Sequence, residues 1–158
     1  MKKLLTLTAL LAALAGAQAQ SFTASLDAAQ AGGGARTGSG TATLTVHDGL
    51  LLDYMVILSG LSGTVNNQHI HGPAAPGVSA GVLVGFNAPV GGMISGVNVP
   101  ITQSTLDSMN AGLTYVNIHT TTFGGGEIRG QISLVPEPTS AAVLGLGLAA
   151  LVVARRRK

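Results

Sequence analysis

Apolar segments close both ends of the chain and leave only residues 20–135 to form a domain in water. The N-terminal segment starts with basic residues and continues with an apolar stretch from Leu4 to Leu14. The C-terminal segment is an apolar run from Ala141 to Ala154, followed by a basic cluster. Both segments suit a lipid bilayer better than a water-soluble core. Any folded domain must therefore be built from the central stretch.

The N-terminal segment has the three parts of a secretory signal peptide. Its basic start and apolar stretch precede Ala17-Gln18-Ala19, a small-x-small cleavage site. We expect signal peptidase to cut after Ala19, which removes residues 1–19 and leaves Gln20 as the first residue. An uncleaved anchor is the alternative, and the shortness of the apolar stretch disfavours it, because about twenty apolar residues are needed to span a bilayer.

Residues 136–158 have the three parts of a sorting segment. Pro136-Glu137-Pro138 precedes the apolar run, and Arg155-Arg156-Arg157 follows it. The positive-inside rule keeps the arginines in the cytoplasm, so everything before the run lies outside the inner membrane. The run is short for a stable transmembrane helix, which suits a transient anchor.

This order of parts resembles the PEP-CTERM sorting signal of exosortase-bearing Gram-negative bacteria. The resemblance implies that the tail holds the protein in the inner membrane transiently. It also implies that an exosortase-type enzyme cuts the tail near the Pro-Glu-Pro motif. The protein then goes to the cell surface or the extracellular matrix.

The charges of the central stretch argue against a nucleic-acid partner. The whole chain has a net charge of +2, but most of its basic residues lie in the two end segments. Within residues 20–135 only Arg36 and Arg129 are basic. The acidic residues outnumber them and are Asp27, Asp48, Asp53, Asp107 and Glu127. Binding to a phosphate backbone needs clustered cations, which this stretch lacks.

Alternation of apolar and polar residues predicts short strands in the central stretch. The predicted strands cover residues 22–26, 41–46, 50–58, 68–71, 82–86, 93–99, 114–120 and 127–134. Asp48-Gly49 predicts a hairpin in which both residues take positive φ. One helix is expected over residues 102–110, with Thr102 or Ser104 as its N-cap and Gly112 as its stop.

These elements predict an all-β fold, because nothing in them follows a βαβ rhythm. We expect an antiparallel, Greek-key-like β-sandwich or barrel with one short helix. A signal helix precedes this domain and a membrane helix follows it. The chain has no cysteine, so packing and sheet hydrogen bonds must stabilise the domain without disulfides.

Strand parity predicts a polar face rich in histidine. His69 and His71 are two residues apart and point to the same side of their strand. The polar sides of the last two strands carry Tyr115, Asn117 and His119 in one, and Glu127 and Arg129 in the other. If these strands are neighbours, all of these side chains share one face. His47, the remaining histidine, lies at a hairpin tip and is expected to face solvent.

Two interpretations of this face remain open. His69, His71 and His119 could occupy three positions around a zinc or copper ion. Alternatively, the face is a structural network in which histidine and tyrosine side chains bind Glu127, Arg129 and loop carbonyls. The second interpretation needs no cofactor, and His-x-His alone is a weak signal for metal.

The sequence offers no complete set of catalytic parts, so we do not expect an enzyme. Its one Gly-x-Ser-x-Gly sequence, residues 77–81, lies between two predicted strands and not in the strand-to-helix turn that would present a nucleophilic serine. It contains no Gly-x-x-x-x-Gly-Lys loop for phosphate, and the central stretch has no lysine. The few acidic residues are scattered and do not suggest a catalytic pair.

Three motifs in order resemble the CHRD domain, which is named for chordin. They are His69–Ala74, Tyr115–Thr120 and Gly126–Ile132, and the resemblance extends over residues 22–134. It implies an extracellular β-sandwich related in shape to Cu/Zn superoxide dismutase, with no firmly assigned activity. Animal members occur in secreted proteins that bind growth factors. Dismutase activity is not expected, because that two-metal centre uses more histidines than this chain contains.

Three functions follow as hypotheses. The first is a non-enzymatic module of the cell surface or matrix, sorted through its tail, with exopolysaccharide or a matrix protein as its partner. The second is an extracytoplasmic metal-binding protein that uses the His-x-His motif. The third and weakest is a polysaccharide-binding module, since the aromatic residues are few and mostly at core positions.

Overall fold

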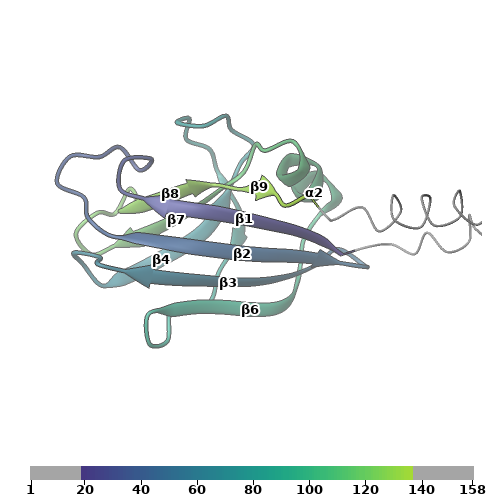
Figure 1. The fold of residues 1–158 in the computed structure, drawn as a ribbon, viewed down its shortest axis with the longest axis horizontal. Helices are drawn as coiled ribbons and strands as arrows, with labels where there is room; N and C mark the ends of the chain where they lie inside the picture. Colours follow the sequence, from purple (N-terminus) through teal and green to yellow (C-terminus); the bar gives the residue numbers. More distant parts are fainter. Residues whose placement is uncertain (1–18, 137–158) are drawn as a thin grey trace, which may run out of the picture.

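The computed structural model describes residues 19–136, which form the coloured ribbon in Figure 1. The predicted signal helix and the predicted membrane helix lie outside the described residues. So do several residues of the predicted processing signals, namely Ala17, Glu137, Pro138, Arg155, Arg156 and Arg157. Within residues 19–136, no helix is long and apolar enough to cross a membrane.

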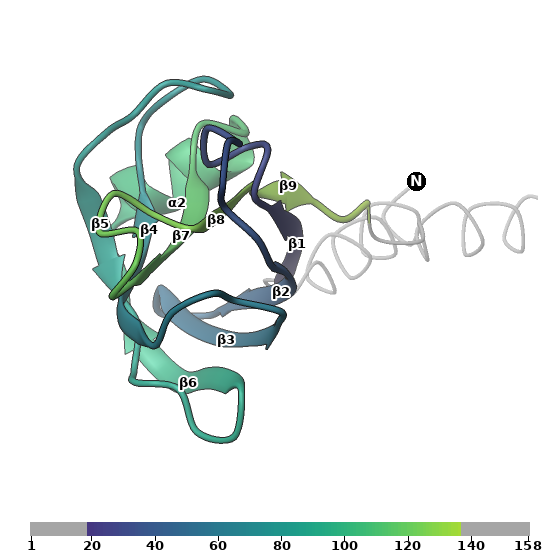
Figure 2. The same cartoon turned by 90° about the vertical axis from the view of Figure 1, so that its left-hand side faces the viewer.

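Antiparallel strands form one curled sheet, as the two views in Figures 1 and 2 show. Nine strands belong to it, in the order β5-β4-β7-β8-β1-β2-β3-β6, with β9 paired to β1. Their bounds are β1 Gln20–Asp27, β2 Ser39–His47, β3 Leu51–Ser59, β4 Val65–His71, β5 Val82–Gly85, β6 Met93–Pro100, β7 Tyr115–Thr120, β8 Ile128–Gln131 and β9 Ser133–Leu134. The sheet curls into a half-barrel, so the expected antiparallel all-β class with one short helix is confirmed.

The hydrophobic core is made by one face of each long strand. Along β1, alternate residues Phe22, Ala24 and Leu26 are at most 2% exposed. The buried side chains of β2 follow the same alternation and are Ala42, Leu44 and Val46. Burying a large apolar side chain contributes roughly 1.5–3 kcal/mol, so this alternating face determines which side of each strand turns inward.

The helix α2 (Gln103–Asn110) begins and ends where the sequence predicts. The Thr102 side chain accepts a hydrogen bond from the Thr105 backbone N–H, which is the contact expected of an N-cap. Gly112, shortly after the helix, takes a φ of +68°, which glycine adopts at little cost. Thr105 and Met109 are buried, so this side of the helix packs against the domain.

The hairpin between β2 and β3 differs from its prediction. His47 pairs with Leu51, so three residues form the loop rather than two. Positive φ falls on Gly49 (77°) and Leu50 (60°), whereas Asp48 is not among the positive-φ residues. The prediction of positive φ at Asp48 was therefore wrong, because the longer loop moves the left-handed positions one residue further along the chain.

The two ends of the described chain lie side by side. β9 pairs with β1 through Phe22–Leu134 and Thr23–Ser133. The Val135 N–H then donates to the Ser21 carbonyl at 2.8 Å. Both chain ends therefore leave the domain at the same end of the sheet, where the grey traces begin in Figure 1.

A close backbone approach at Gly130 gives the first prediction. A Cβ atom at this position would meet the Ser25 carbonyl oxygen, which is backbone and cannot rotate away. Gly130→Ala is therefore expected to lower the free energy of unfolding by about 1–3 kcal/mol in urea denaturation. Gly85→Ala is the matched control, because nothing lies within 4 Å of its added Cβ. Equal stabilities for the two variants would contradict the β1–β8 contact.

Candidate metal centre

Three histidines from two adjacent strands converge on one point. His69 and His71 lie on β4, and His119 lies on β7, which pairs with β4 in antiparallel register. One nitrogen from each ring lies within 4.8 Å of the other two. The ring of His69 is edge-on to each of the others, with centroid separations of 5.3 Å. No other histidine and no acidic residue among the described residues joins the group.

Loop carbonyls fix the tautomers of two of the rings. The Nδ1 atom of His71 is 2.9 Å from the Ala80 carbonyl oxygen. The Nδ1 atom of His119 is 2.8 Å from the Gly124 carbonyl oxygen. A carbonyl can only accept, so each Nδ1 carries the hydrogen and, in the neutral ring, each Nε2 carries a lone pair, which in His119 faces the Asn117 amide nitrogen. Hydrogen bonds of this kind orient the ligand histidines of metal sites.

Several polar atoms in the cluster are buried without a hydrogen-bond partner in the described part of the chain. They are His69 Nδ1, His71 Nε2 and Asn117 Oδ1. Leaving such an atom unsatisfied costs about 1–3 kcal/mol. A cation bound between the rings would satisfy the free nitrogens of His69 and His71.

The environment keeps two of the histidines, His69 and His71, in the form that binds metals. Burial lowers the pKa of His69, and repulsion from His119 and His71 lowers it further. Burial also lowers the pKa of His71; the Ala80 hydrogen bond opposes this shift, and the charges of His119 and Arg129 reinforce it. Both rings are therefore neutral at pH 7, as a metal ligand must be.

Asn117 lies among the histidines and closes part of the cluster. It is opposite His69 in the register of β4 and β7. Its Nδ2 atom is 3.3 Å from His119 Nε2 and 3.3 Å from the Gly125 carbonyl oxygen. His69 and His119 are only half-buried, so one side of the cluster faces solvent. Three protein ligands with one open side match the arrangement of sites that keep an exchangeable coordination position.

Tyr115 and Arg129 form a stack against His71. The Tyr115 ring lies nearly parallel to that of His71, with centroids 5.1 Å apart and an interplanar angle of 7°. The Arg129 guanidinium carbon is 3.3 Å from the centroid of the Tyr115 ring. Arg129 also donates to the Val78 carbonyl at 2.9 Å, and the Tyr115 hydroxyl accepts from the Ala80 N–H at 3.0 Å. The stack thereby holds the loop whose carbonyl orients His71.

Glu127 is not on the histidine face, contrary to the parity prediction. Its carboxylate accepts hydrogen bonds from Ser62 N–H at 2.6 Å, Thr120 Oγ1 at 2.7 Å and Thr37 Oγ1 at 3.3 Å. The residue precedes β8, so strand alternation does not govern the direction of its side chain. Ser62 and Thr37 come from distant loops and no local sequence pattern indicated them.

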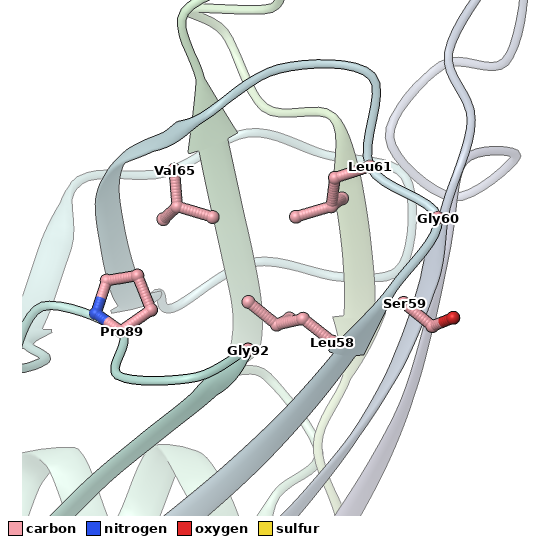
Figure 3. A pocket seen from close by; sticks show the side chains of 7 residues that line it. All are labelled: Leu58, Ser59, Gly60, Leu61, Val65, Pro89 and Gly92. Carbon is pink, nitrogen blue, oxygen red and sulfur yellow. The ribbon is translucent and has the colours of Figure 1, made fainter.

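Two other features lie apart from the three-histidine group. They are His47 and an apolar pocket. His47 Nε2 is 2.9 Å from Asp53 Oδ2 on an exposed hairpin, in line with the expected solvent-facing position. Figure 3 shows a pocket of about 290 Å³ between the end of β3 and the start of β6. Its lining is mostly apolar and includes Leu58, Leu61 and Val65. Neither feature contributes a residue to the three-histidine group.

Neutral imidazoles restrict the cations that this cluster can hold. Imidazole nitrogen suits zinc, copper and other first-row transition metals. Calcium and magnesium prefer oxygen ligands, and no carboxylate reaches this group among the described residues. The residues present therefore fit a single transition-metal ion with three nitrogen ligands.

Comparisons with known families divide the chain into two parts. A family described as the CHRD domain matches residues 22–132, which include all three histidines, Asn117 and Arg129. A family described as the PEP-CTERM protein-sorting motif matches residues 134–158. No curated protein and no solved structure matches the chain.

The buried carboxylate of Glu127 gives a prediction for acid stability. Burial tends to raise its pKa, but hydrogen bonds from Ser62, Thr120 and Thr37 together hold the pKa below the ordinary value of 4.5. The stabilisation by the ionised group is therefore present above about pH 4.5 and is lost as the pH falls through the lowered pKa.

Glu127→Gln should be less stable than wild type at pH 7 by about 1–3 kcal/mol, because it weakens a buried hydrogen-bond network. The difference should shrink between pH 5 and pH 3, roughly the range in which the wild-type carboxylate takes up a proton. Urea denaturation across this range measures both effects. Asp107→Asn is the control, since Asp107 is exposed and its carboxylate bonds only the Gln103 side chain. A constant difference for Glu127→Gln at all pH values would rule out an ionised Glu127.

Proposed function

Because the chain belongs to the CHRD-domain family and ends in a PEP-CTERM sorting motif, we propose that it is a non-enzymatic module of the cell surface or extracellular matrix. The sorting motif marks the protein for export, transient membrane anchoring and processing by an exosortase-type system. The proposal adds that the CHRD domain then acts by binding a partner rather than by catalysing a reaction.

The positions of the acidic residues support a binding role. Most of them have separate structural partners: Asp27 binds Gln30, Asp53 binds His47, and Asp107 binds Gln103. Glu127 is enclosed by hydroxyl and backbone donors. A general acid and base acting together need two titratable groups near one substrate atom. These carboxylates instead bind different partners, so they do not form an acid–base pair.

A matrix protein is the preferred partner, with exopolysaccharide as the alternative. Sugar rings usually stack on exposed aromatic side chains. Tyr54 and Phe86 stack on each other inside the core with ring centroids 4.0 Å apart. Phe22 and Tyr115 are also buried, and the remaining aromatic residue, Phe123, has the Arg36 guanidinium over its ring. These positions leave few stacking surfaces for a polysaccharide.

The sorting function can be tested by changing the Pro-Glu-Pro motif. Replacing Pro136, Glu137 and Pro138 with alanine should leave the tail uncut and the protein in the inner membrane. Fractionation of an exosortase-bearing host, with mass analysis of the C-terminus, measures both effects. Thr139→Ala with Ser140→Ala is the matched control, because these residues lie between the motif and the apolar run. Surface delivery of the motif variant with its tail removed would refute this processing route.

Metal binding is a second candidate function, favoured by one specific observation. Three imidazole nitrogens lie within 4.8 Å of one another, and two of the rings are oriented by loop carbonyls. If the face were only a structural network, His69 Nδ1 and His71 Nε2 would be expected to have hydrogen-bond partners, and within residues 19–136 they have none. Zinc or copper bound by His69, His71 and His119 accounts for the free nitrogens.

Metal titration of histidine variants tests this candidate. The protein should bind one equivalent of Zn(II), and saturating metal should raise its melting temperature by several degrees. His71→Ala should abolish both effects, because it removes the most buried ligand of the group. His47→Ala is the control, since His47 is exposed and pairs with Asp53. Stoichiometric binding that survives His71→Ala would exclude this site.

A further inference from the structure

The candidate metal centre has no neighbouring anion to balance a bound metal. Its three ligands are imidazoles, which carry no negative charge, and no carboxylate joins them within the described residues. Asp27 is opposite Arg129 in the strand register, but its carboxylate binds the Gln30 backbone and side-chain amides. Glu127 is held by Ser62 and Thr120. The charge of a bound metal would therefore remain uncompensated by the protein.

A buried cation lies next to the centre. Arg129 is 6% exposed, and its guanidinium lies over the Tyr115 ring, which stacks on the ligand His71. Its guanidinium donates a hydrogen bond to the neutral Val78 carbonyl. Within residues 19–136 the only ion pair closer than 4 Å is His47–Asp53, so no carboxylate neutralises Arg129 at that distance. An arginine side chain stays protonated in proteins.

The repulsion between this fixed charge and a bound metal depends on the charge of the metal. Coulomb energy is proportional to the product of the two charges, so a dication is repelled twice as strongly as a monocation at the same place. Binding constants depend exponentially on energy. The factor by which the repulsion lowers the binding constant of a dication is therefore the square of the factor for a monocation.

We infer that Arg129 biases the three-histidine centre toward a monovalent transition-metal ion, with Cu(I) as the ligand and Zn(II) as the disfavoured competitor. The inference rests on the proposed metal-binding function and specifies which ion that site takes. Copper accepts imidazole ligands, and a monovalent ion needs no anionic partner to balance a second charge. The chain contains no cysteine, so no thiolate competes for the copper.

Two variants, one that removes the charge of Arg129 and one that keeps it, test the inference. Affinities for Zn(II) and for Cu(I), the latter measured without oxygen against a chromophoric chelator, are compared in the full chain purified in detergent. Arg129→Gln should tighten the binding of both ions at low salt, and the factor for Zn(II) should be the square of the factor for Cu(I). Arg129→Lys keeps the charge, so the ratio of the two affinities should stay close to wild type even if loss of the stack on Tyr115 changes both affinities.

Ionic strength provides a second measurement on the same two proteins. Salt screens the repulsion from Arg129, so the difference in affinity between the wild type and Arg129→Gln should shrink with added salt, and it should shrink more for Zn(II) than for Cu(I). Equal fold-changes for the two ions, or a difference that salt does not change, would overturn the role of Arg129 in ion selection and leave the metal site standing. If neither ion binds the wild-type protein, the proposed metal-binding function fails, and the inference fails with it.

Discussion

The pairing of β4 with β7 is the contact on which the candidate site depends. The histidines of the two strands are about fifty residues apart in the chain, and only this antiparallel register brings them to one face. The opposite face of the same strands carries Ile70, Val116 and Ile118, which are all 0% exposed. Their burial fixes the register of the two strands. A slip of one residue would turn these side chains out and the histidines in, which is energetically prohibitive.

Polar clusters lie on both sides of the sheet at β7 and β8, and they differ in whether their polar atoms have hydrogen-bond partners. On the core side, Glu127 is fully enclosed, and each carboxylate oxygen accepts hydrogen bonds from neighbouring donors. On the other side, His71 and Asn117 are almost as buried, but each has an atom without a hydrogen-bond partner among the described residues. The first cluster meets the requirement of a structural network, and the second has atoms for which a bound group would supply the missing partner.

Alternation and capping chemistry were sufficient to predict most strands and the helix, because these are local consequences of burial and of backbone hydrogen bonding. They failed at Asp48 and Glu127, where a loop interrupts the strand period. The side of the strand to which His69, His71 and His119 point could also be predicted from the alternation within each strand. Their orientation could not, because the carbonyls of Ala80 and Gly124 come from irregular loops. The Tyr115–Arg129 stack likewise depends on the register between strands.

The pairing of β9 with β1 determines how the domain would carry mechanical load. The sorting motif begins in β9, so force applied through the tail reaches the domain at a strand of only two residues beside the first strand of the sheet. A pairing of two residues has few hydrogen bonds to break. Under such a load β9 should detach from β1 before the histidine-bearing strands β4 and β7, which pair over a longer stretch, come apart.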